Sequence, residues 1–106
     1  MSKYLIEASY TGDGVKGVLK EGGSARRAAV EQLVKAAGGT VESYYFVFGE
    51  DDVIVVVDLP DNATMAAVSL AISATGSVTT AVRVLLTPEE IDVAAHKTVN
   101  YRAPGR

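Results

Sequence analysis

Two arginines at the start of a predicted helix are the residues whose type and position best suit a binding site. Arg26 and Arg27 follow Gly22-Gly23, and a helix capped by Ser24 would leave its first backbone N–H groups free. Guanidinium groups beside such N–H groups bind a carboxylate or a phosphate. Without an anion, arginines in the first turn oppose the helix dipole, at a cost of about 0.3–1 kcal/mol. The alternative, which we favour on the sequence alone, is that they pair with neighbouring acidic residues: Glu21, Asp13 or Glu31.

Tyr10 and His96 are the other side chains that could contact a ligand. Tyr10 ends the first predicted strand, which makes it the tyrosine best placed to line a cavity. His96 is the only histidine, so a histidine-rich metal cluster is excluded. Near the end of a short helix, a histidine suits the helix dipole and solvent. A general-base role would require His96 to reach a pocket.

Two further motifs resemble ligand-binding loops, but their context favours ordinary turns. Residues 12–17 match the G-x-G-x-x-G pattern of dinucleotide-binding loops. The helix that should follow would be interrupted at Gly22-Gly23, so we interpret the segment as a flexible loop containing a short helical turn. Glu50, Asp51 and Asp52 crowd three carboxylates together, as in sites for hard cations. They lack calcium-loop spacing, which favours a solvated turn.

Composition excludes several classes of protein. The chain has 106 residues, a net charge of −3 and a pI of about 5.0. Nucleic-acid binding depends largely on clustered Lys and Arg, so a nucleic-acid partner is not expected. The chain has no cysteine, which excludes disulfides and thiolate metal sites. No apolar run approaches the roughly 20 residues that span a bilayer, and no signal-peptide core is present. We predict a cytoplasmic protein without a membrane partner and without a metal or other cofactor.

Hydrophobic periodicity predicts one α+β domain over residues 1–97, followed by an extended tail over 98–106. The hairpin centred on Gly49–Asp52 organises this domain, because its second strand is almost continuously apolar. Asp61 is the predicted N-cap of a helix whose apolar face is formed by Met65, Val68, Leu70 and Ile72. The sequence from Thr87 to Glu90 is typical of a capping box. The predicted strands are 3–10, 40–48, 53–59 and 78–86, and the predicted helices are 24–37, 61–76 and 88–97. This order, βαββαβ with an appended C-terminal helix, predicts a ferredoxin-like four-stranded antiparallel sheet with helices on one face.

Both faces of the predicted sheet are too apolar to remain in water. Alternation places Tyr45 on one face with apolar residues such as Tyr4 and Ile6. The other face carries a second apolar set, with Glu7 and Arg83 as a charge pair. We predict that a second copy covers this other face, forming a two-fold dimer or a larger ring of dimers. The alternative is that the C-terminal tail covers it. The residues predicted at the dimer interface are Leu5, Tyr44, Phe46, Phe48, Ile54, Val56 and Leu85.

An ordered set of short motifs resembles the GYD-domain proteins over roughly Lys3 to Lys97. These motifs are Tyr10-Thr11, Gly14-Val15-Lys16, Arg26 or Arg27, Gly38-Gly39, the turn Gly49–Asp52, Gly76-Ser77-Val78 and Thr87–Glu90. Asp51 stands where the family's Gly-x-Tyr-Asp turn has tyrosine, so no role of that tyrosine carries over. The resemblance implies membership of the dimeric α+β barrel group. That group includes cofactor-free monooxygenases, isomerases, haem enzymes and ligand-sensing domains.

The sequence leaves two classes of function open. The first is a small-molecule binding or assembly module with a hydrophobic or anionic ligand, in which Tyr10, Arg26, Arg27 and His96 are the candidate contacts. The second is a cofactor-independent enzyme, monooxygenase-like or isomerase-like, acting on a small hydrophobic or aromatic substrate. We favour the first, because no nucleophile, base and orienting group are recognisable together.

Overall fold

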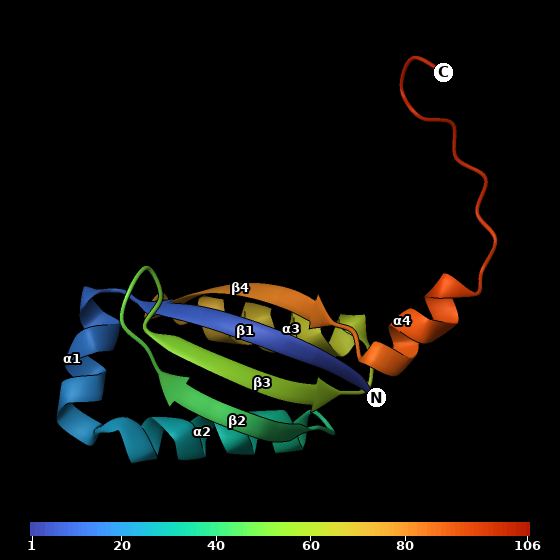
Figure 1. Cartoon of the computed structure of the whole chain (residues 1–106). Coiled ribbons are helices and arrows are strands. Elements are labelled where there is room, and N and C mark those ends of the chain that lie inside the picture. The colour runs from blue at the N-terminus through green and yellow to red at the C-terminus, as the bar shows by residue number, and fades with distance from the viewer.

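The computed structural model describes all 106 residues and forms one four-stranded antiparallel sheet with four helices (Figure 1). The elements in chain order are β1 (Ser2–Tyr10), α1 (Gly12–Glu21), α2 (Gly23–Ala36), β2 (Thr40–Phe46), β3 (Val53–Leu59), α3 (Asn62–Ser73), β4 (Val78–Leu85) and α4 (Pro88–Ala95). The strand order is β2-β3-β1-β4, so β1 and β3 are central.

The core lies between the sheet and helices α2 and α3. Alternate residues of β1 and β3 are buried on this face, where Tyr4 pairs with Val57 and Ile6 with Val55. The Tyr4 hydroxyl donates to Asn62 Oδ1 at 2.6 Å, so the polar end of this buried tyrosine has a hydrogen-bond partner. The helices contribute the remaining large buried side chains: Val34 from α2, and Met65 and Val68 from α3. Leu70 was predicted on the buried face of α3 but is 71% exposed, because it lies on the outer side of the helix.

Residues 12–21 form a complete helix, which corrects the predicted flexible loop. Thr11 caps α1, with its side chain accepting from the Gly14 N–H at 3.4 Å. Gly22 adopts a φ of 84°, a conformation that glycine adopts without steric cost, and this turn separates α1 from α2. Gly22 is also the N-cap of α2, so the prediction that Ser24 caps this helix was wrong.

A bulge in β2 reverses part of the predicted sheet-face assignment. The register shifts between Val41 and Ser43, so Tyr44 pairs with Val55 and Phe46 with Val53. Both aromatic residues therefore lie on the face that carries the helices, not on the open face where the period of two placed them. Tyr45 moves the other way, to the open face beside Ile54. β2 ends at Phe46, two residues earlier than predicted, and Phe48 is fully exposed beyond it.

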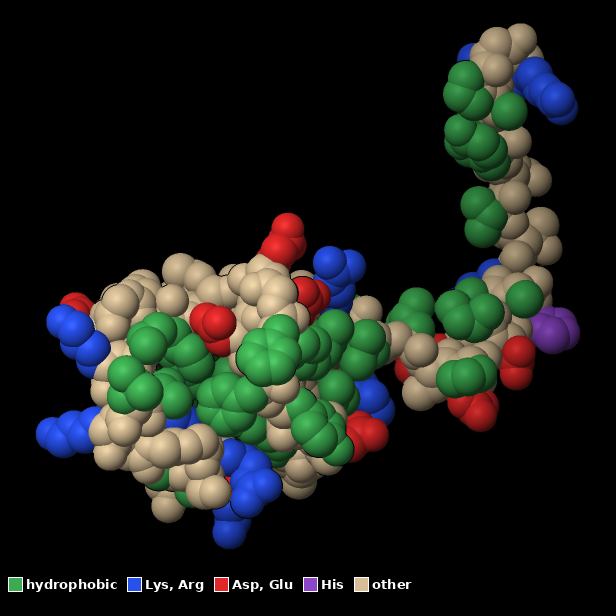
Figure 2. All heavy atoms as spheres, turned by 60° about the vertical axis from the view of Figure 1, so that its left-hand side comes forward, with side chains coloured by type: hydrophobic (Ala, Val, Ile, Leu, Met, Phe, Trp, Pro, Cys, Tyr) green, Lys and Arg blue, Asp and Glu red, His purple; other side chains and the backbone are tan.

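The C-terminal arm, which we define as α4 with residues 96–106, extends away from the sheet (Figure 1). The predicted capping box is present, since Thr87 and Glu90 exchange hydrogen bonds at 3.1 Å. Figure 2 shows hydrophobic side chains exposed along the arm. Ile91, Val93 and Tyr101 are among them, each at least half exposed. Within one chain, the tail therefore does not cover the open face of the sheet.

Candidate functional site

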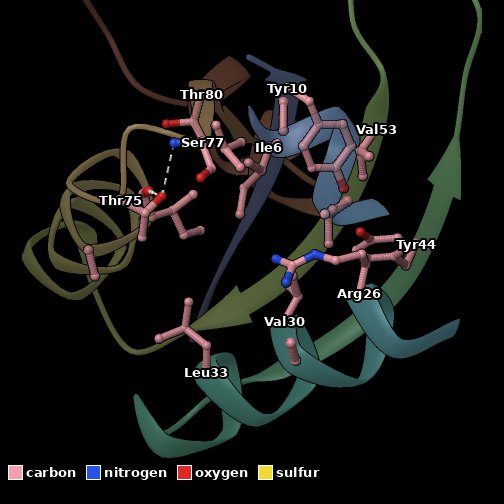
Figure 3. A pocket seen from close by; sticks show the side chains of 18 of the residues that line it. Ile6, Tyr10, Arg26, Val30, Leu33, Tyr44, Val53, Thr75, Ser77 and Thr80 are labelled. Atoms are coloured by element: carbon pink, nitrogen blue, oxygen red, sulfur yellow. Dashed lines mark hydrogen bonds between the residues drawn. The ribbon is translucent and has the colours of Figure 1, made fainter. Parts of the chain in front are cut away.

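A half-enclosed cavity of about 440 Å³ lies between the sheet and helices α1, α2 and α3 (Figure 3). Of the 19 residues that line it, 12 are hydrophobic, so most of its wall offers only van der Waals contacts. The largest aliphatic side chains in the wall are Ile6, Val30, Leu33, Val53, Val55, Ile72 and Val78. Its position follows from the fold, because the small residues of α1 form one wall opposite the core-facing side of β1 and β3.

Tyr10, Arg26 and Tyr44 form the polar end of this cavity. They come from the end of β1, the first turn of α2 and the bulged strand β2. Figure 3 shows the Arg26 side chain pointing into the cavity, with the rings of Tyr10 and Tyr44 beside it. Two phenolic hydroxyl groups and one guanidinium therefore converge on a site that is otherwise largely apolar.

Arg26 is only partly satisfied by the chain. Its Nη1 donates to Glu21 Oε1 at 3.0 Å, and this hydrogen bond is the main reason that the pKa of Arg26 is raised. The neighbouring Tyr10 hydroxyl raises the same pKa further. The Arg26 Nε is buried and has no hydrogen-bond partner in the chain. A buried donor without a partner costs about 1–3 kcal/mol, so this atom is a position where an acceptor would stabilise the protein.

Tyr44 stays neutral over a wide pH range. Burial is the largest cause of its raised pKa, because a phenolate loses its hydration in the apolar wall. Tyr10 beside it raises the pKa further, while the positive charge of Arg26 lowers it. Tyr44 is therefore available as a hydrogen-bond donor to an acceptor placed in the cavity.

The acidic turn after β2 fixes the position of Tyr10. Asp52 accepts from the Tyr10 backbone N–H at 2.8 Å, and its own N–H donates to the Ala8 carbonyl at 2.8 Å. Asp51 accepts from the Ser9 hydroxyl at 3.1 Å. The turn was predicted to be solvated, and in the structure it also folds back onto the end of β1. Its three carboxylates form no metal cluster, since no group of three possible metal ligands occurs in the structure.

Helix α1 closes the cavity through a close backbone approach. The Thr11 N–H donates to the Ser77 carbonyl at 2.9 Å, which ties the start of α1 to the turn before β4. A Cβ atom on Gly14 would lie 2.1 Å from the same carbonyl oxygen and 3.1 Å from the Tyr10 ring. Gly14, the second glycine of the G-x-G-x-x-G motif, is therefore required for packing at this point.

The structure brings together two of the four candidate contacts from the sequence. Tyr10 and Arg26 both line the cavity. Arg27 lies outside it, where its Nε is 3.7 Å from Glu31 Oε1 on the helix surface. His96 is exposed at the end of α4, and its Nδ1 lies 2.7 Å from the Asp92 carbonyl oxygen. Tyr44 was missed as a cavity residue because only the bulge in β2 turns it inward.

The open face of the sheet is a second surface with functional potential. Leu5, Ile54, Val56 and Leu85 lie on it, half-buried, and Tyr45 adds an exposed aromatic ring. Two groups of charges flank these apolar side chains. Arg83 Nε donates to Glu7 Oε1 at 2.8 Å, as the sequence predicted, and Lys3 pairs with Asp58 and Glu42.

The comparisons with known proteins identify a family for this chain. No curated protein and no solved structure shows a significant match. No helix of the structure is both long and apolar enough to cross a membrane. The family model of the GYD domain matches residues 4–95, which include every helix, every strand except the first two residues of β1, and all the residues that line the cavity. Because this match extends over most of its length, the chain belongs to the GYD domain family.

Proposed function

We propose that the protein binds a small, mainly hydrophobic molecule in the cavity between the sheet and helices α1, α2 and α3. The observation that carries this proposal is the cavity itself: it has a volume of about 440 Å³ and is largely apolar, with Tyr10, Tyr44 and the Arg26–Glu21 pair at one end. Ligand sites in proteins commonly have volumes of roughly 300–1,000 Å³ and the same combination of apolar walls and few polar groups. A filled core would not leave such a space.

We also propose that the working form is a homodimer that packs through the open face of the sheet. The strand order β2-β3-β1-β4, with the helices on one face, supports a ferredoxin-like unit. The apolar side chains on the open face support association with a second sheet, which would make an α+β barrel. The exposed hydrophobic residues of the C-terminal arm offer a second surface for the same partner.

Native mass spectrometry of freshly purified protein tests both parts of this proposal. We expect twice the mass of one chain, together with a retained small molecule that is released on denaturation. A monomeric mass at micromolar concentration would refute the dimer. Sedimentation at the same concentration provides an independent measurement.

A cavity-filling variant tests the binding site directly. Val30 lines the cavity from α2, so Val30→Phe should fill part of the space and abolish retention of the ligand. Gln32→Phe is the matched control, because Gln32 is exposed on the same helix and is not part of the cavity wall. Equal ligand retention in both variants would place the ligand elsewhere.

A second candidate function is a cofactor-independent enzyme, and the convergence of hydrogen-bond donors favours it. Arg26, Tyr10 and Tyr44 could together stabilise negative charge that develops on a substrate oxygen. The one carboxylate in the cavity wall is that of Glu21, which is already paired with Arg26. Exchange of carbon-bound hydrogen for deuterium in a bound ketone, lost in Tyr44→Phe, would support an enzyme. Binding without exchange would support a binding module.

A further inference from the structure

We propose that the ligand carries a single carboxylate, which the inner edge of the Arg26 guanidinium binds at the polar end of the cavity. This inference rests on the proposed ligand-binding function and specifies the chemical class of the ligand. The remainder of the molecule is an aromatic or branched hydrophobic group that fills the apolar part of the cavity.

The free donor of Arg26 is the first step of the argument. The guanidinium uses one nitrogen, Nη1, for Glu21, while Nε is buried in the chain without a partner. A guanidinium edge that contains Nε presents two parallel N–H groups, which match the two oxygens of a carboxylate. The pairing with Glu21 therefore leaves the inner edge, which contains Nε, without an acceptor from the chain.

The surroundings of Arg26 select a hydrogen-bond acceptor. Tyr10 and Tyr44 place their hydroxyl groups at the same end of the cavity, and the burial of Tyr44 keeps its proton in place. Glu21 is the only carboxylate in the cavity wall. The polar end thus offers three donor groups to a ligand, while its one carboxylate is already paired with Arg26.

The charge balance favours a monoanion over a phosphate. Glu21 already offsets part of the positive charge of Arg26, and no lysine or second arginine lines the cavity. A phosphate with nearly two charges would lack counter-charges in this apolar environment. A carboxylate needs only the donors that are present.

The size of the cavity limits the rest of the ligand. About 440 Å³ equals roughly fifteen water molecules at about 30 Å³ each, which corresponds to about ten to fifteen non-hydrogen atoms. Away from Arg26, the lining consists of aliphatic side chains such as Leu33 and Ile72, together with the side chains of Thr75, Ser77 and Thr80. These dimensions and this lining fit an aryl or arylalkyl carboxylic acid.

Matched acid and amide pairs test the proposal on the intact protein. Calorimetry with benzoate, cinnamate and naphthoate, each beside its neutral amide, separates charge from shape. We expect at least one acid to bind about tenfold or more tightly than its amide, as the loss of a charge-assisted bidentate contact implies. Equal affinity of acid and amide would overturn the inference, as would the absence of binding by every acid.

Variants of three residues then locate the carboxylate. Arg26→Lys keeps the charge but removes the planar fork, and should weaken acid binding about tenfold without changing amide binding. Arg27→Lys is the matched control, because Arg27 lies on the outer surface of the same helix. The affinity of this variant for the acid should stay within about twofold of that of the parent protein. Glu21→Gln removes the competing carboxylate and should tighten acid binding, a gain of function that cannot arise from misfolding. An unchanged or lower acid affinity in Glu21→Gln, or equal losses in both arginine variants, would overturn the proposal.

Failure of this inference differs from failure of the proposed function. If the amides bind as well as the acids and Val30→Phe abolishes both, the cavity is a binding site but Arg26 does not select a carboxylate. If neither acids nor amides bind and no molecule is retained on purification, the proposed function itself is refuted.

Discussion

Gly14→Ala tests whether α1 packs against the turn before β4 as closely as the structure has it. The new methyl carbon would lie 2.1 Å from the Ser77 carbonyl oxygen and 3.1 Å from both the Ser77 carbonyl carbon and the Tyr10 ring. The carbonyl is held in place by hydrogen bonds from Thr11, including one from its backbone N–H at 2.9 Å. The overlap can therefore be relieved only by moving backbone of α1 or of the turn.

The expected cost follows from two opposing terms. Overpacking of this kind destabilises a protein by about 1–3 kcal/mol, and a contact with fixed backbone belongs at the upper end. Replacing glycine by alanine inside a helix stabilises the helix by up to about 1 kcal/mol, which offsets part of this loss. The net loss for Gly14→Ala is thus about 2 kcal/mol, or roughly 8 °C in melting temperature for a domain of this size.

Gly17→Ala provides the matched control on the same helix. A Cβ atom there meets nothing within 4 Å, so only the helix-propensity term remains, and the variant should gain about 0.5–1 kcal/mol. Both variants should be measured by urea and thermal unfolding at one fixed protein concentration, because dimer stability depends on concentration. If Gly14→Ala is as stable as Gly17→Ala, α1 does not lie where the structure places it, and the cavity loses one wall.

Three further predictions concern single interactions. Asp52→Ala removes the acceptor of the Tyr10 backbone N–H and should cost about 1.5–3 kcal/mol in urea unfolding, whereas Asp52→Asn keeps an acceptor and should cost less. Because the fold raises the pKa of Tyr44 above its ordinary 10.0, stability should fall as pH rises above about 10, and Tyr44→Phe should flatten this decline in unfolding curves followed across pH. The Thr64 hydroxyl and the Thr64 backbone N–H both donate to the Asp61 carboxylate and lower its pKa, the hydroxyl having the larger effect. The capping contribution is therefore present above the ordinary value of 3.8 and lost as pH falls, and Asp61→Ala should remove this acid-dependent step.

Features that depend on local chemistry could be predicted from the sequence. The strand Val53–Leu59 has the predicted bounds, because a continuous apolar, β-branched run can be buried on both faces only in the middle of a sheet. The caps at Asp61 and Thr87 formed as predicted, since each places a side-chain oxygen near N–H groups within the same turn. None of these features requires information about distant residues.

Features that depend on contacts between distant segments could not be predicted. The bulge between Val41 and Ser43 adds a residue to one strand only, and it exchanges the faces of Tyr44 and Tyr45. Strict alternation has no signal for such an insertion, so the ring that lines the cavity was assigned to the dimer interface. Helix α1 was likewise read as a loop, because glycine lowers helix propensity while its value for close packing against Ser77 is visible only in three dimensions.

The cavity arises because one end of the sheet brings its polar residues together while helix α1 supplies little side-chain volume there. β1 ends at Tyr10, α1 follows across that end, and the turn at Gly22 starts α2 so that Arg26 returns beside Tyr10 (Figure 1). The inner positions of α1 are Gly14 and Gly17, which lack the side chains that would otherwise fill the space. A larger residue at Gly17, where a Cβ atom meets nothing within 4 Å, would fill part of this space. The combination of a glycine-lined helix and an unpaired guanidinium nitrogen is therefore better explained by a bound acceptor than by the stability of the chain alone.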